Sequence, residues 1–102
     1  METYKKLVVF LKKKYPDQRV NIRRTTVPAK FDGMCEQKKD NSFTIRIDKN
    51  LPEYYSIDVL LHEFAHVLSW SKDKNVHGNN WGIAYSKVYR AYLEEFKKDS
   101  HV

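Results

Sequence analysis

Residues 59–70, "VLLHEFAHVLSW", place two histidines and a glutamate inside an apolar run, and this feature constrains the fold more than any other. Residues four apart on a helix lie on one side with Cβ atoms about 5–6 Å apart, so His62 and His66 can bind one metal ion together. Glu63 lies about 100° further round the helix, where it can contact a water held by that ion. The alternative is that all three are ordinary polar residues on the solvent side of an amphipathic helix. Because burying an ionised carboxylate is costly without a compensating charge, and the run holds no other charged residue, we favour a metal site.

A catalytic zinc usually has three protein ligands and a fourth position for water, so the motif requires one more donor. An arrangement with a glycine three residues and a histidine six residues after the second histidine is excluded, because Ser69 and Lys72 occupy those positions. If the helix ends near Ser71, the six residues to His77 span roughly 20 Å when extended, which exceeds the return distance of about 7–8 Å. We therefore favour His77 as the third ligand. The other candidates are Glu94 and Glu95 in the last helix, His101 in the charged tail, and Cys35.

The N-terminal half predicts one helix followed by strands. Apolar residues at helical spacing predict an amphipathic helix that ends before Pro16. β-branched residues predict a strand within residues 19–28, and a short irregular strand is expected around residues 34–38, between two turns. Strict alternation in residues 42–48 places Phe43, Ile45 and Ile47 on one face of a third strand, which predicts a sheet covered by helices on one side only.

The C-terminal half predicts two helices. The first starts near Ser56 and runs to about Ser71, and the second is capped by Asn79 or Asn80 and carries an apolar stripe that ends at residue 96. The predicted fold class is therefore α+β, with an N-terminal helix, a small three-stranded sheet, the histidine-bearing helix and a C-terminal helix. We expect residues 1–102 to form a single domain, since a chain of this length encloses one core.

Composition limits the compartment and the partners. A hydrophobic fraction of 41% is too high for a disordered chain, and no apolar run is long enough to span a membrane. The lone Cys35 excludes an internal disulfide and favours a reducing compartment. We expect a monomeric cytoplasmic protein without a membrane segment.

The formal net charge of +6 is compatible with a polyanion such as DNA as a partner. Lysines spread along helix faces more often form a solvated exterior than a binding site. Arginines on strands are held more rigidly, so the candidates for contacting substrate or DNA are Arg23, Arg24 and Arg46.

The segment "HEFAHVLSWSKDKNVHGNNWGIAYSKVY", residues 62–89, resembles the SprT-like, or Spartan-type, metallopeptidase domain. The resemblance implies a minimal zincin-like fold, one zinc ion held by His62, His66 and His77, and Glu63 as general base. Spartan-type enzymes cleave proteins crosslinked to DNA, so protein substrates and DNA are implied as partners. The sequence departs from many relatives in its short loop before His77 and in lacking their cysteine-containing zinc module. Small stand-alone forms occur in phage and bacterial genomes, which implies a host cytoplasm if a phage encodes the chain.

The resulting hypothesis is a zinc-dependent endopeptidase in which Glu63 activates a zinc-bound water. Substrate is expected to add a strand to a sheet edge, either at residues 34–39 or at residues 43–48. Core packing is favoured over an oxyanion-donor role for each of the tyrosines near the motif, Tyr54, Tyr55, Tyr85 and Tyr89. Trp81 is expected to seal the helix pair behind the zinc.

Two rival functions remain. The first is a non-catalytic zinc-containing domain that binds DNA or protein, and Glu63 argues against it because a structural zinc needs no base. The second is an ImmA/IrrE-like peptidase, which shares the first motif, but the "HGNNWG" element at residues 77–82 favours the SprT-like family.

Overall fold

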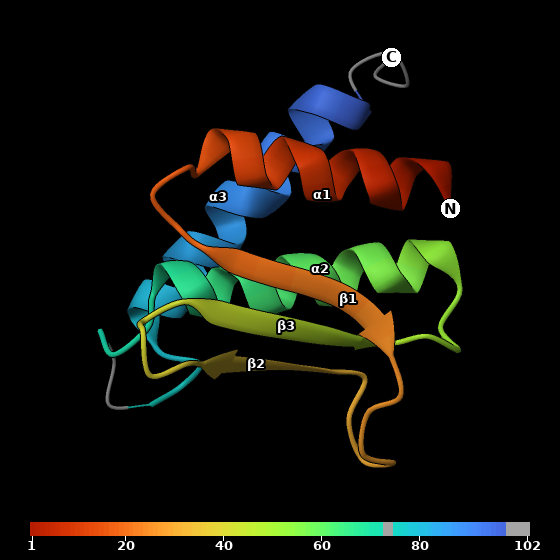
Figure 1. Ribbon diagram of the computed structural model, residues 1–102. Helices are drawn as coiled ribbons and strands as arrows, with labels where there is room; N and C mark the ends of the chain where they lie inside the picture. The colour runs from red at the N-terminus through yellow and green to blue at the C-terminus, as the bar shows by residue number, and fades with distance from the viewer. Residues whose placement is uncertain (73–74, 98–102) are drawn as a thin grey trace.

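The computed structural model describes residues 1–72 and 75–97, in which three helices accompany a three-stranded mixed sheet (Figure 1). The elements follow one another as α1 (Glu2–Lys14), β1 (Val20–Thr25), β2 (Gly33–Gln37), β3 (Phe43–Asp48), α2 (Glu53–Leu68) and α3 (Asn79–Phe96). This order confirms the expected α+β fold class.

The last strand in the sequence, β3, lies at the centre of the sheet. The strand order is β1-β3-β2, with β1 parallel and β2 antiparallel to β3 (Figure 1). The turn from β2 to β3 contains Asn41 in the left-handed region, at φ 68°, and the Asp40 carboxylate accepts a hydrogen bond from the backbone N–H of Ser42. Phe43, Ile45 and Ile47 are buried as the alternation predicts, while Arg46 lies on the opposite, partly exposed face.

The start of α2 differs from the sequence expectation. The helix begins at Glu53, three residues before Ser56, with Pro52 as its N-cap residue at φ −67°. A proline suits this position because its fixed φ is already helical and no backbone N–H is lost from the helix. The Glu53 carboxylate lies in the positively polarised first turn and accepts a hydrogen bond from the backbone N–H of Tyr4 at 3.1 Å. Ser56 is instead buried inside the helix and donates to the Leu51 carbonyl at 3.3 Å.

Two other helix boundaries also need correction. α2 ends at Leu68, and Ser69 is its C-cap residue, so the helix stops short of Ser71. α3 begins at Asn79 with Gly78 as its N-cap residue, so neither asparagine occupies the cap position. α2 therefore ends about three residues earlier than expected, which leaves more chain for the connection that carries His77.

α2 is the centre of the molecule, since the sheet packs on one side of it and α1 and α3 lie against its other sides (Figure 1). α2 approaches the sheet closely at Gly33, where an added Cβ would lie 2.6 Å from Val59 Cγ1. Side chains from all these elements form one core, whose fully buried members include Leu7, Leu11, Ile45, Ile47, Leu60, Leu61, Phe64 and Val88. α2 is therefore held rigidly on several sides, and it carries the motif histidines on the surface that remains.

Candidate metal centre

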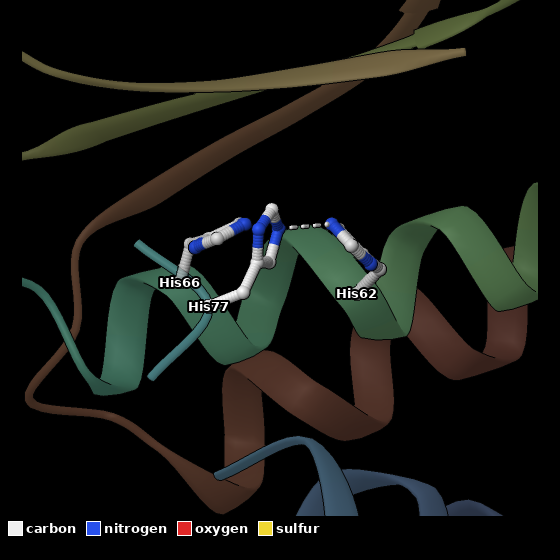
Figure 2. Close-up of side chains that lie close together, drawn as sticks. All are labelled: His62, His66 and His77. Carbon is white, nitrogen blue, oxygen red and sulfur yellow. Dashed lines mark hydrogen bonds between the residues drawn. The ribbon is translucent and has the colours of Figure 1, made fainter. Parts of the chain in front are cut away.

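Three histidines converge above α2. His62 and His66 lie on successive turns of the helix, and the ring of His77 comes from the connection before α3 and lies between them (Figure 2). One ring nitrogen from each histidine can be chosen so that all three lie within 4.8 Å of one another. The Nε2 atoms of His62 and His77 are 3.3 Å apart. The group could therefore hold a metal ion.

The donor set suits zinc in chemistry, and one pair of its nitrogens has the spacing of two zinc ligands. Zinc binds imidazole nitrogens at about 2.0–2.1 Å, so two ligands of a tetrahedral site lie roughly 3.3–3.4 Å apart, which matches the separation between His62 and His77. Burial lowers the pKa of His62, with a further contribution from the nearby His77. Burial and the two neighbouring imidazoles lower the pKa of His66 to about 4. Both shifts favour the neutral imidazole, which is the form that binds metal.

The chain around His77 fixes the position of this residue. The Asn75 side chain accepts a hydrogen bond from the His77 backbone N–H at 3.1 Å, and the Asn75 carbonyl accepts one from Gly78 at 2.9 Å. α3 starts immediately afterwards, so the short turn places the ring directly at the end of a rigid helix.

Trp81 lies against all three imidazoles. Its ring centroid is 4.8 Å from that of His77, 5.0 Å from that of His62 and 5.6 Å from that of His66. Its indole N–H also donates to the His62 carbonyl at 3.3 Å, which ties α3 to α2 behind the rings. This position agrees with the expected role of Trp81 in sealing the helix pair.

Glu63 faces the same cavity as the histidines. The cavity has a volume of about 470 Å³, and its walls are α2 and residues 30–33, which lead into β2. The Glu63 side chain is only 8% exposed, and burial raises the pKa of its carboxyl to about 7. A carboxyl with this pKa exchanges a proton readily at neutral pH, as a general base must.

The other candidates for a third ligand do not join the histidines in the part of the chain that the structure describes. Glu94 and Glu95 are exposed on α3, and neither belongs to the histidine group. Cys35 packs against the core, and burial, together with nearby Glu63 and Glu36, raises the pKa of its thiol to about 12. His101 lies outside the described residues.

The three arginine candidates lie on the sheet, away from the cavity. Arg24 donates hydrogen bonds from Nη2 to the carbonyls of Lys49 and Leu51, at 2.6 and 2.9 Å, which supports the connection into α2. Arg46 forms an ion pair with Glu36, and Arg23 is its neighbour on β1. None of the three arginines is among the described residues that line the cavity beside the histidines. Their contact with substrate or DNA stays a prediction.

Two features of the cavity were not anticipated. The wall formed by residues 30–33 was expected only as a turn, although Gly33 after an irregular segment was a signal for close backbone approach. The second feature is Asp58, near the start of α2. It lines the cavity and accepts a hydrogen bond from the Tyr85 hydroxyl at 2.8 Å. Of the four tyrosines, Tyr55 lines this cavity, and its hydroxyl donates to Asp32 at 2.5 Å.

Comparison with known proteins agrees with this geometry. No curated protein matches the chain at a significant level. In the described part of the chain, no helix is long and apolar enough to cross a membrane. The model of the SprT-like family matches residues 1–100. The chain therefore belongs to the SprT-like family, a membership that indicates a metallopeptidase-like domain.

Proposed function

We propose that this chain is a zinc-dependent endopeptidase that hydrolyses peptide bonds of protein substrates, DNA-associated proteins among them. The observation that carries the proposal is the convergence of three imidazoles with a buried glutamate in one cavity. His62, His66 and His77 would hold the ion, and three protein ligands leave a position for water or substrate. When bound, zinc would supply an acidified water and a Lewis acid for the scissile carbonyl.

Glu63 supplies the proton transfers in this proposal. Its raised pKa allows the carboxylate to take a proton from the attacking water and then, as the acid, to give it to the leaving amine. Burial also keeps bulk water away from the group, which strengthens its interaction with a nearby cation. General acid–base catalysis of this kind typically contributes roughly 10²–10⁴-fold to the rate.

The sheet topology and the position of the cavity together favour β2 as the edge at which substrate would bind. β3 is paired on both sides, so residues 43–48 have no free edge, and that alternative is excluded. β2 is an edge strand, and it starts at the cavity wall. Hydrogen bonds that join residue 32 to residue 48 and residue 38 to residue 42 set the antiparallel pairing. The backbone groups of Gly33, Cys35 and Gln37 therefore point to the open side, where an extended substrate can pair with them.

Charge supports DNA-associated substrates. A larger cavity, of about 980 Å³, starts at His77 and runs between α3 and the end of α1. Its lining includes the cations Lys14, Lys87 and Arg90 and one acid, Glu94. A phosphate backbone in this cavity would gain from these cations and would bring a DNA-bound protein to the candidate centre.

The test compares the wild type with Glu63→Gln, using Glu95→Gln, the same change at an exposed position of α3, as the control. Zinc content is measured by elemental analysis, and cleavage of an unfolded test protein is measured with and without DNA. We expect about one zinc per chain in all three proteins and a loss of roughly 10²–10⁴-fold in cleavage for Glu63→Gln alone. Stoichiometric zinc without Glu63-dependent cleavage under any DNA condition would instead establish the non-catalytic binding domain.

A further inference from the structure

A second cavity, lined with tyrosines, lies next to the candidate metal centre. It has a volume of about 480 Å³ between the first turns of α2 and the later turns of α3. We call it the tyrosine pocket and define it by Tyr54, Tyr55, Tyr89 and Tyr92 with the acids Glu53 and Asp58. The rim is open to solvent, since Tyr54 is 77% exposed and Tyr89 is 39% exposed.

The tyrosine pocket adjoins the cavity that holds the histidines. Tyr55 and Asp58 line both cavities, so the two share a wall. Asp58 precedes His62 by one helical turn, a rise of about 6 Å. An extended substrate advances about 3.3 Å per residue, so a side chain roughly two residues from the cleaved bond reaches the pocket.

The charge of the pocket is opposite to that of the whole chain. Asp58 accepts the Tyr85 hydroxyl on Oδ1, and among the described residues no partner is found for Oδ2. Lys97 is the one cation among the described residues that line the pocket. Lys97 comes twelve residues after Tyr85, the hydrogen-bond partner of Asp58. Twelve residues of helix rise about 18 Å, so Lys97 lies at the end of the pocket far from Asp58. The end next to the metal centre therefore combines a carboxylate with tyrosine rings.

Rings and carboxylate together select the chemistry of the occupant. A guanidinium or ammonium group is attracted to the face of a tyrosine ring within about 6 Å and also pairs with a carboxylate. An aliphatic side chain gains only from the rings, and an acidic side chain is repelled by Asp58. The long apolar stem of arginine or lysine can pack on the tyrosine rings while its charged group reaches the exposed carboxylate of Asp58.

We propose that the tyrosine pocket is a specificity pocket for an arginine or lysine side chain of the substrate. The proposal rests on the proposed peptidase function, because it assigns the pocket to the same cleft. It adds a preference that the metal centre does not provide, since the three histidines and Glu63 act on the peptide bond whatever side chains flank it.

The first test uses matched peptides that carry arginine, norleucine or glutamate at each of three positions on either side of the cleaved bond. We expect kcat/KM to favour arginine over norleucine by about tenfold at one position, roughly two residues from the bond. The ratio should fall towards one in Asp58→Asn and should fall in Tyr54→Ala, which changes an exposed side chain. Asp17→Asn, the same change at an exposed position outside the pocket, should keep the ratio. Both peptides are cleaved by the same variant, so the ratio of their kcat/KM values cancels any effect of Asp58→Asn on the nearby His62.

The second test measures binding without turnover. Glu63→Gln is titrated with N-acetyl-arginine amide and with N-acetyl-norleucine amide, and the tyrosine ring signals are followed by NMR. Arginine binding that depends on Asp58, without Glu63-dependent cleavage by the wild type, would support the pocket and refute the peptidase. Cleavage without an Asp58-dependent arginine preference would overturn the pocket and leave the peptidase standing. Equal binding of both amides, or binding of neither, would also overturn the pocket.

Discussion

Replacing Gly33 by alanine tests the contact that places β2 beside Glu63. The added Cβ would lie 2.6 Å from Val59 Cγ1, 3.1 Å from the Arg46 carbonyl oxygen and 3.4 Å from Glu63 Cγ. Carbon atoms in contact are normally about 3.5–4.0 Å apart, so the overlap with Val59 is about 1 Å. Val59 is buried and β-branched, so it cannot turn away, and β2 must move from α2.

The expected cost follows from two opposing effects. Overpacking of this kind costs about 1–3 kcal/mol of unfolding free energy. Gly33 does not have a positive φ, so alanine also gains about 0.4–1 kcal/mol by restricting the unfolded chain. The clash outweighs the gain, and we expect a net loss of about 0.5–2 kcal/mol. Cleavage should fall as well, because the displaced strand is the proposed substrate edge.

Urea unfolding measures the effect, and Gly82→Ala provides the matched control. At Gly82, on exposed α3, an added Cβ meets nothing within 4 Å, so the same substitution should stabilise the chain by about 0.4–1 kcal/mol. In a Val59→Ala background, Gly33→Ala should lose most of its cost, which gives a coupling energy of about 1–2 kcal/mol. The reasoning is refuted if both glycine substitutions shift stability in the same direction or if the double mutant is additive.

Three further predictions concern the metal and the thiol. His77→Ala should weaken zinc binding by more than about 100-fold in a chelator competition, since loss of an outer partner alone costs about 10–100-fold; an unchanged affinity would exclude His77 as a ligand. Zinc at 100 times its Kd should raise the unfolding free energy of the wild type by about 2.7 kcal/mol in urea, and equal stabilisation of His77→Ala would place the ion elsewhere. Burial raises the pKa of Cys35 to about 12, so its reactive thiolate is scarce at pH 8 and increases only as the pH approaches 12. Iodoacetamide should therefore modify the folded chain at least about 100-fold more slowly than the chain in urea. Equal rates would contradict the burial of Cys35.

The residues that sequence analysis located well are those whose local pattern agrees with their tertiary surroundings. The alternation of Phe43, Ile45 and Ile47 predicts both the strand and its buried face, and both are confirmed. The spacing of His62 and His66 follows from helical geometry alone. His77 was chosen by reach along the chain, and it lies beside them.

The features that sequence analysis missed depend on contacts between distant segments. Serine is common at the start of helices, which favoured Ser56 as the start of α2. Pro52 and the hydrogen bond from the Tyr4 backbone N–H to Glu53 instead place the start three residues earlier. Strand order cannot be read from periodicity, so the sequence left two candidate edges open until the pairing of β3 on both sides excluded one. Gly33 matters because of its distance from Val59, which no local pattern encodes.

The position of Trp81 against the three imidazoles gives the chain an optical reporter. The sequence contains two tryptophans, and the other, Trp70, packs edge-on against Phe43 at 5.3 Å. A cation among the rings changes the electric field at the Trp81 indole, whereas Trp70 responds to the integrity of the core. Emission from a Trp70→Phe chain should therefore follow metal occupancy, and emission from a Trp81→Phe chain should follow unfolding, with no attached dye.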